Sequence, residues 1–187
     1  MLEAPSLLAP GLLVALPQLR DPNFHRAVVL LTAHADDGAM GFVVNRPIPA
    51  TVSEVLQGLD LPWMGDDAEP VWAGGPVGQQ SGFVLFDSPG SEQDPSAEQI
   101  TSGLWLSASL ETLRSLGLAP PGRFRLLLGY AGWSPGQLEN EVLEGSWMVL
   151  PPDPELLFEV PHDQMWEQAF RRCGIDPVTI VPSEGVQ

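Results

Sequence analysis

The sequence contains no lysine, and only 8 of its 187 residues are basic, all of them arginine. Twenty-four aspartate and glutamate residues oppose them, which gives a net charge of −16 at pH 7. Proteins that bind DNA or RNA directly neutralise phosphates with clustered basic side chains, and anionic membrane surfaces attract the same chemistry. The composition therefore disfavours direct nucleic-acid binding and binding to a membrane surface.

Cysteine is almost as scarce. The one cysteine, Cys173, excludes an internal disulfide and a cysteine-rich metal centre. Its spacing on a predicted C-terminal helix places it on the apolar face, as an inert core thiol. The N-terminus has no positive region, and the apolar stretch 7–16 is broken by Pro10-Gly11 and is too short to span a bilayer. We therefore expect a soluble, cytoplasmic protein without signal peptide or membrane anchor.

Hydrophobic residues make up 44% of the chain and charged residues 17%, which is typical of a globular protein. The length favours one domain over residues 1–187, with an ordered core at about 6–180. Residues 88–99 are almost entirely polar, and we expect a mobile acidic surface loop there.

Apolar runs and helix-start signals give the expected elements. Between the runs 27–32 and 41–44 there is no room for a crossover helix, which favours antiparallel pairing. Short strands interrupted by short helices indicate an α+β fold with a largely antiparallel or mixed sheet. The expected strands are 12–16, 27–32, 41–44, 71–73, 82–86, 104–106, 124–128 and 147–150, and the expected helices lie near 51–58, 107–116, 153–157 and 163–173.

The stretch 129–141 is the strongest chemical signal. It follows an apolar strand, so we expect a tight glycine turn and then a helix, and residues 132–136 fit the G-x-S-x-G pattern of a serine nucleophile. Asp153 and His162 follow Ser134 in the chain order of a hydrolase triad. Pro135, however, has no N–H to donate to an oxyanion.

A structural interpretation accounts for the same residues. Ser134 would be the N-cap of the helix, Pro135 its first residue, and Gln137 would complete a capping box. A hydrolase that uses Ser134, His162 and Asp153, or His34 as base, remains the alternative hypothesis.

The residues around this serine allow two interpretations. The glycines of the stretch permit sharp turns and close backbone approach, while Trp133 and Trp147 are large core or cleft-lining groups. In the first interpretation the stretch is a packed turn. In the second, Trp133, Gln137 and Glu139 line a groove for a ligand or partner, because pockets combine aromatic walls with a few polar groups.

Three further motifs carry polar chemistry. His34 precedes Asp36 and Asp37, but a single imidazole makes a poor metal site, and we expect a turn histidine bonded to the backbone. Arg46, which follows Asn45, offers a fork of donors for a carboxylate or phosphate, or for an internal acid. The run Gly74-Gly75-Pro76 could present N–H groups to an anion or form a structural turn.

These motifs occur in the order and spacing of one family. The chain resembles the AlgH/YqgE family of bacterial proteins over about residues 6–180. The resemblance implies one α+β domain, with a bifurcated mixed sheet curled toward a pseudo-barrel and short helices around it. It implies no established activity, and the name of the family derives from a proposed regulatory role in exopolysaccharide gene expression. One departure is Ala108, where the family has a threonine-rich segment. The motifs that carry the resemblance are Leu12 to Pro17, Asp21-Pro22, Phe24, His34, Gly38 to Gly41, Asn45-Arg46-Pro47, Gly74 to Val77, Gly129 to Trp133, Gly136 to Glu139 and Trp147.

The sequence thus favours a cytosolic, non-enzymatic binding or regulatory protein that requires no cofactor or metal. It would act through a protein partner or a small ligand at a groove between the Gly74-Gly75-Pro76 turn and the Trp133 turn, not by direct DNA binding. The oligomeric state is left open. The candidate binding residues are His34, Asn45, Arg46, Gly74, Gly75, Pro76, Tyr130, Trp133, Gln137 and Glu139.

Overall fold

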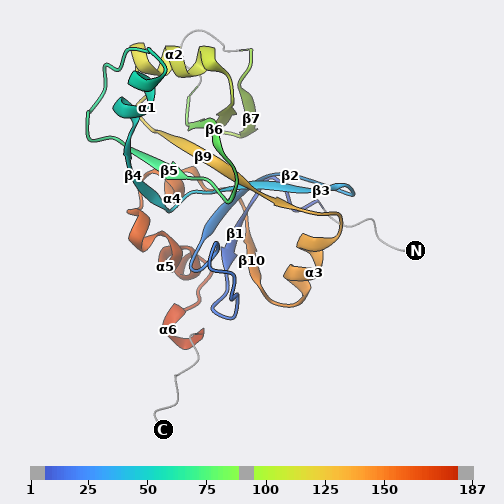
Figure 1. Cartoon of the computed structure of the whole chain (residues 1–187). Helices are drawn as coiled ribbons and strands as arrows, with labels where there is room; N and C mark the ends of the chain where they lie inside the picture. Colours follow the sequence, from blue (N-terminus) through green and yellow to red (C-terminus); the bar gives the residue numbers. More distant parts are fainter. Residues whose placement is uncertain (1–6, 89–94, 181–187) are drawn as a thin grey trace. The chain divides into compact units, whose positions relative to one another are not determined.

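The computed structural model of the chain describes residues 7–88 and 95–180 (Figure 1). The chain forms two compact units: the first takes residues up to Asn45 and from Gly132 onward, and the second takes Arg46–Ala131. The predicted single domain over residues 1–187 stays a prediction.

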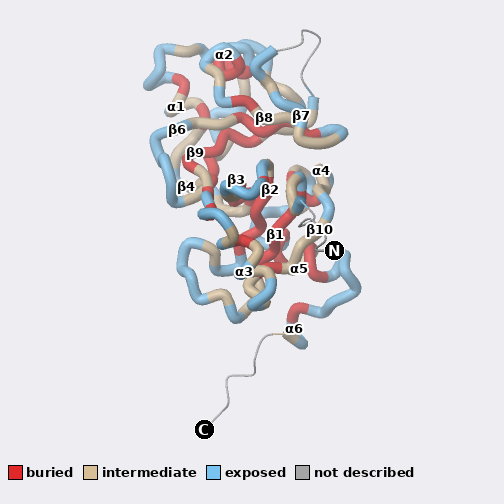
Figure 2. Tube along the Cα trace, turned by 90° about the vertical axis from the view of Figure 1, so that its right-hand side faces the viewer, coloured by how far each residue is buried: buried red, intermediate tan, exposed pale blue. Residues whose placement is uncertain are grey.

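The first unit contains a four-stranded antiparallel meander in the order β10-β1-β2-β3. β1 is buried along its whole length, so it forms the centre of this core, and Figure 2 shows it as a continuous buried segment. Leu12 lies opposite Leu150 on one side and opposite Leu30 on the other. The strands are β1 (Gly11–Ala15), β2 (Val28–Ala35), β3 (Gly38–Val43) and β10 (Trp147–Leu150).

Four short helices complete the first unit. The longest, α5, buries one apolar stripe whose Trp166 donates from Nε1 to the carbonyl oxygen of Ala15 in β1 at 2.8 Å. Arg26 lies over the same indole, with Cζ 4.8 Å from the ring centroid. The hydrogen bond fixes α5 against the central strand, and the Arg26 contact fixes it against the segment before β2. The helices are α3 (Gln137–Leu143), α4 (Pro154–Phe158), α5 (His162–Arg172) and α6 (Pro177–Ile180).

The second unit contains a mixed sheet. β9 pairs in parallel with β5 and antiparallel with β6, and β8 and β7 follow β6 in antiparallel order. β4 pairs with β5 at the other edge. The strands are β4 (Pro47–Thr51), β5 (Pro70–Ala73), β6 (Val77–Phe86), β7 (Glu98–Thr101), β8 (Leu104–Ser107) and β9 (Phe124–Trp133), the last of which continues into the first unit.

Two helices, α1 (Val52–Gly58) and α2 (Leu110–Leu118), pack on this sheet. α1 begins with the predicted capping box, in which the Thr51 hydroxyl accepts from the Glu54 N–H and the Glu54 carboxylate accepts from the Thr51 N–H. The shared core contains Val52, Leu56, Val71, Val84, Phe86, Leu113, Leu116 and Leu126.

A buried cation joins two strands of the second unit. Arg125 of β9 is only 6% exposed, and its Cζ lies 3.7 Å from the ring centroid of Trp72 in β5. Burial lowers the pKa of Arg125 to about 10, while the charge of Glu69 acts in the opposite direction. The guanidinium thus stays protonated at neutral pH, and its stacking on the indole supports the parallel pairing of β5 with β9.

Glycines allow three backbone segments of the second unit to touch. A Cβ on Gly74 would lie 2.3 Å from the carbonyl oxygen of Gly129, and one on Gly75 would lie 2.2 Å from that of Tyr130. Gly129 itself has φ +78°, and a Cβ there would meet the carbonyl oxygens of Gly75 and Val77. These residues are therefore glycine because backbone occupies the space of a side chain.

The α+β class with a mixed, largely antiparallel sheet is confirmed. The predicted tight turn at Gly129 is wrong, because β9 continues to Trp133 and the positive φ of Gly129 bends the strand without ending it. β4 was not expected from its prolines, which an edge strand tolerates.

The predicted loop 88–99 also needs correction. Glu98 and Gln99 belong to β7, an edge strand that pairs only with β8. Their polar side chains are exposed, so the strand forms without burying them. Residues 89–94 of the expected mobile loop lie outside the described residues. In the described part of the chain, no helix is both long enough and apolar enough to cross a bilayer.

Replacing Gly129 by alanine should strongly destabilise the protein. The new Cβ would lie 2.5 Å from the Gly75 oxygen and 2.9 Å from the Val77 oxygen, at a backbone angle that costs a non-glycine residue about 1 to 2 kcal/mol. With the overpacking we expect a loss of about 3 kcal/mol in urea unfolding. Gly122→Ala, where a Cβ meets nothing within 4 Å, is the control and should change stability by less than about 0.5 kcal/mol. Equal stability of the two variants would contradict this account of the glycines.

Candidate functional site

The candidate residues separate into two groups. His34, Asn45, Trp133, Gln137 and Glu139 belong to the first unit, whereas Arg46, Gly74, Gly75, Pro76 and Tyr130 belong to the second. Within the first unit, His34 lies on β2 and Trp133 at the end of β9. Gln137 and Glu139 lie on α3. The groove expected between the Gly74-Gly75-Pro76 turn and the Trp133 turn would join the two groups and stays a prediction.

The turn between β9 and α3 differs from the predicted cap. Helix α3 begins at Gln137 after Gly136, whose φ is +75°, and the N-cap has no side-chain hydrogen bond. Ser134 is therefore not the N-cap. The Gln137 side chain does accept a hydrogen bond from the Ser134 N–H at 3.0 Å, so half of the expected capping box is present. Pro135 and the left-handed Gly136 delay the start of the helix by two residues.

Glu141 is the centre of the contacts around α3. Its Oε2 accepts hydrogen bonds from two indole nitrogens, those of Trp133 at 3.0 Å and of Trp147 at 2.8 Å. Its Oε1 accepts from Nε2 of Gln137 at 2.9 Å. One carboxylate thus satisfies the N–H groups of two buried indoles, which are 6% and 3% exposed.

An aromatic cluster surrounds this carboxylate. The ring of Phe24 stacks on Trp133 with centroids 6.1 Å apart and meets Trp147 edge-on at 5.4 Å. The two indoles lie edge to face at 6.1 Å. Trp133 therefore packs against side chains of its own unit, and Phe24 stacks on one face of its indole ring.

His34 holds the other edge of α3. It lies on strand β2, not in the turn predicted for it, and its side chain is 2% exposed. Nδ1 accepts a hydrogen bond from the backbone N–H of Leu8 at 2.9 Å, as expected for a histidine bonded to the backbone. Neutral His34 therefore carries its proton on Nε2, which lies 2.6 Å from Oε1 of Glu139.

The environment of Glu139 favours its ionised form. A hydrogen bond from its own backbone N–H, and then the one from His34, lower the pKa of Glu139 below its ordinary value of 4.5. The carboxyl is therefore ionised at neutral pH. Its charge-assisted hydrogen bond with His34 joins α3 to β2.

The periodicity of α3 explains how both edges are held. Leu138 is fully buried under the helix, Glu139 lies on one side of it, and Gln137 and Glu141 lie on the other. The outward side carries Asn140, Leu143 and Glu144, which are all exposed, and Leu143 is 84% exposed. The inward side chains of this short helix are thus buried or hydrogen-bonded to the rest of the unit, and its outward side chains are exposed to solvent.

Asn45 has a structural role in the first unit. Its Nδ2 donates to the carbonyl oxygen of Arg26 at 2.9 Å, and its Oδ1 accepts from the N–H of Val28 at 3.0 Å. Arg26 has φ +52°, an uncommon backbone angle, and the two hydrogen bonds of Asn45 hold the chain on either side of that bend.

The candidates of the second unit also form backbone contacts. The carbonyl oxygen of Arg46 accepts from the N–H of Ala73 at 2.8 Å. Gly74 and Gly75 pack on Gly129 and Tyr130 as described above. The ring of Tyr130 meets Phe83 edge-on at 6.2 Å, and Pro76 is exposed.

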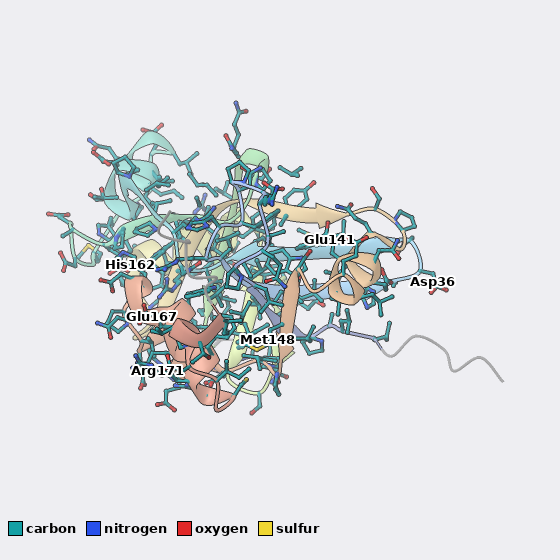
Figure 3. All side chains as sticks on the ribbon, turned by 90° about the horizontal axis from the view of Figure 1, so that it is seen from below. Asp36, Glu141, Met148, His162, Glu167 and Arg171 are labelled. Atoms are coloured by element: carbon teal, nitrogen blue, oxygen red, sulfur yellow. The ribbon has the colours of Figure 1, made fainter. Side chains whose placement is uncertain are left out.

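The acid and the base of the alternative serine triad lie at the starts of two helices. Asp153 caps α4 by accepting from the Leu156 N–H at 3.1 Å, and its other oxygen pairs with Arg172. His162 begins α5, well apart from Glu141 on α3 within the first unit (Figure 3).

Two other expectations concern ligating groups. Cys173, predicted as a core thiol, is exposed because α5 ends at Arg172 and Cys173 is its C-cap residue. Among residues 7–88 and 95–180, no three histidine, cysteine, aspartate or glutamate side chains are grouped in a way that could hold a metal.

The sequence analysis assigned no role to Glu141, and it named Phe24 only as part of the family motifs. A signal for Glu141 existed, because it lies four residues after Gln137 and two nearby tryptophans needed acceptors for their N–H groups. Phe24 carried no such signal, since its contacts with Trp133 and Trp147 span more than a hundred residues.

These features define an α+β protein of mixed sheet, in which a glycine-bent strand leads into a short helix held at both edges by carboxylates. The AlgH-like family model matches residues 12–178. The chain therefore belongs to the AlgH-like family, and the resemblance read from its motifs is confirmed.

Individual relatives agree with this assignment. A UPF0301 protein of Anaeromyxobacter dehalogenans is 45% identical over 190 residues, which cover 98% of this chain and 96% of that protein. A UPF0301 protein of Myxococcus xanthus is 42% identical over 180 residues, which cover 96% and 98%. The solution structure of the AlgH protein of Pseudomonas aeruginosa matches over the full length of both chains with a TM-score of 0.78 and 33% identity. A crystal structure of a Corynebacterium diphtheriae protein shares the fold, with a TM-score of 0.71 and 24% identity over 88% of this chain and 86% of that one.

Truncation of Glu141 should expose its role as an acceptor. Glu141→Ala leaves two buried indole N–H groups without the carboxylate, and we expect a loss of about 2 to 4 kcal/mol in urea unfolding. Glu141→Gln keeps one acceptor oxygen and should lose less. Glu144→Ala, at the exposed C-cap of the same helix, is the matched control and should lose less than about 0.5 kcal/mol. Equal effects of Glu141→Ala and Glu144→Ala would refute the acceptor role.

The pair of Glu139 with His34 should appear in the pH dependence. Because the pKa of Glu139 is lowered in the folded state, its contribution to stability is present above pH 4.5 and is lost as the pH falls through the folded pKa. We expect a carboxyl NMR titration of Glu139 to have its midpoint below 4.5. In His34→Leu the midpoint should rise toward the ordinary value. An unchanged midpoint in that variant would show that His34 does not stabilise the carboxylate.

Proposed function

We propose that this protein is a cytosolic, non-enzymatic binding or regulatory protein that acts by binding a protein partner through the outward face of α3. The observation that carries the proposal is the combination on one helix of saturated inner contacts and an 84% exposed leucine. Exposed leucines are common singly, but this one lies on a helix fixed by Leu138 beneath it and by carboxylate contacts at both edges. A pre-organised surface loses little entropy when it binds.

The surroundings of the helix support a protein partner. Gly38 leaves room for the carbonyl oxygen of Trp133 and so lets the β2–β3 turn pack against the end of β9, shortly before α3. That turn carries the exposed acids Asp36 and Asp37, and α3 carries the exposed Glu144. A leucine followed by an acid, with two more acids in the turn that packs near the other end of the helix, suits a partner that offers an apolar pocket and a basic rim.

The chemistry of the chain supports neither of two other activities. Direct DNA binding would have to overcome a net charge of −16. Hydrolysis by Ser134 would need a base and an oxyanion donor, and Pro135 offers no N–H for the latter. The AlgH protein of Pseudomonas aeruginosa shares the fold over its full length, and the regulatory role that the family name implies is compatible with action through a protein.

The test is affinity capture at physiological salt with three baits: the wild type, Leu143→Ser and Val178→Ser. Val178 is 77% exposed on α6 and serves as the matched control. We expect a protein that is captured by the wild type and by Val178→Ser and is lost from Leu143→Ser. Capture that does not depend on Leu143 would refute the α3 surface.

Two further measurements separate the other activities. A mobility shift of specific DNA by the purified protein that survives physiological salt would overturn the proposed mode of action. Ester turnover that disappears in Ser134→Ala would instead favour a hydrolase.

A further inference from the structure

A second exposed apolar surface lies in the second unit, where the C-terminal ends of α1 and α2 meet. Leu59 at the end of α1 is 48% exposed, Met64 in the following loop 70%, and Leu118 at the end of α2 59%. These three residues are called the helix-end patch. Figures 1 and 2 both show α1 and α2 as neighbours. Large apolar side chains that gather on a surface mark interaction sites more often than scattered ones do.

Backbone contacts join the members of the patch. The N–H of Met64 donates to the carbonyl oxygen of Gly117, the residue before Leu118, at 2.9 Å. A Cβ on Gly117 would lie 2.1 Å from the carbonyl oxygen of Pro62, so the loop lies directly on α2. On the side of α1, the N–H of Leu61 donates to the carbonyl oxygen of Leu56 at 2.9 Å. The loop between Leu59 and Met64 is therefore fixed to both helices.

Trp63 anchors the same loop from beneath. Its ring meets Phe124 edge-on with centroids 6.0 Å apart, and its Nε1 donates to the carbonyl oxygen of Asp66 at 3.0 Å. While Trp63 packs against the core, the neighbouring Met64 points its apolar side chain into solvent. The patch is thus an ordered surface that has not collapsed into the core.

The charge around the patch has one dominant sign. Asp60, Asp66 and Asp67 are exposed in or next to the loop, and Arg114 on α2 is an exposed base. Neither α1 nor α2 has a basic residue in its last turn. Two helix C-termini therefore contribute partial negative charge that no side chain of those turns offsets. Apolar contact and negative potential occur together at this place.

We infer that the helix-end patch is a docking site for a cationic amphipathic segment of a protein partner, in which leucine-like side chains recur beside lysine or arginine. The apolar side chains would contact Leu59, Met64 and Leu118, and the basic ones would face the aspartates and the helix ends. A second copy of this chain fits poorly, because its acidic rim would face another acidic rim. The inference concerns a different unit from the α3 surface and does not rest on the proposed function.

The probe is a fluorescein-labelled synthetic peptide of leucine and lysine that forms an amphipathic helix, titrated in fluorescence polarisation at physiological salt. A leucine–glutamate peptide of the same pattern and an oligolysine of the same charge are the controls. We expect the wild type to bind the leucine–lysine peptide and neither control. In addition, the methyl NMR signal of Met64 should shift during the titration.

Variants locate the site. Met64→Ser combined with Leu118→Ser should weaken binding at least about tenfold, since central apolar contacts carry most of the affinity of an interface. Asp66→Asn with Asp67→Asn should weaken it less and reduce its salt dependence. Val178→Ser, which alters a 77% exposed residue of the first unit, should bind as the wild type does. Circular dichroism checks that each variant is folded.

Three results would overturn the inference. The first is equal binding of oligolysine, which would indicate charge attraction alone. The second is undiminished binding by the Met64→Ser, Leu118→Ser variant. The third is a wild-type dimer in sedimentation that Leu118→Ser dissociates, which would identify a second copy as the occupant.

Discussion

The carboxylate of Glu141 holds together the end of β9, the start of β10 and the helix between them through its hydrogen bonds. Trp133 is the last residue of β9 and Trp147 the first of β10, and both donate their indole N–H to the same oxygen. A buried indole N–H needs an acceptor, and a half-buried carboxylate needs donors, so each group removes the cost of burying the other. The hydrogen bonds of one side chain therefore fix two strand ends, and the aromatic cluster with Phe24 fills the space around them.

Helix α3 shows what this constraint achieves. A seven-residue helix is not stable alone in water, so tertiary contacts must supply its stability. Leu138 supplies the apolar contact, Glu141 the contact toward the tryptophans, and Glu139 the contact toward His34. The polar residues that look like ligands in the sequence are thus occupied in holding the helix. The opposite side of the helix, with Asn140 and Leu143, remains exposed to solvent.

Local patterns determined which parts could be predicted. The capping box of Thr51 with Glu54, the proline start at Asp153 and the apolar stripe of α5 depend on residues within one or two turns, and each appears in the structure. The contact of His34 with Glu139 spans 105 positions, and no local pattern marks it. β7 was missed because an edge strand needs hydrogen bonds but no apolar face. Cys173 was misplaced because α5 ends one residue before it, and a helical period gives the face of a residue only while the helix lasts.

The glycines explain why a nucleophile-like motif occurs without a nucleophile's surroundings. Pro135 and the left-handed Gly136 end one strand and delay one helix, which places Gln137 where its side chain can accept from Ser134 and donate to Glu141. Gly38 leaves room for the Trp133 carbonyl, and in the second unit Gly74 and Gly75 leave room for Gly129 and Tyr130. These glycines answer backbone requirements, and Gln137 answers a hydrogen-bonding requirement. A pattern that would elsewhere expose a reactive serine here builds a rigid support, which holds the outward face of α3 in place.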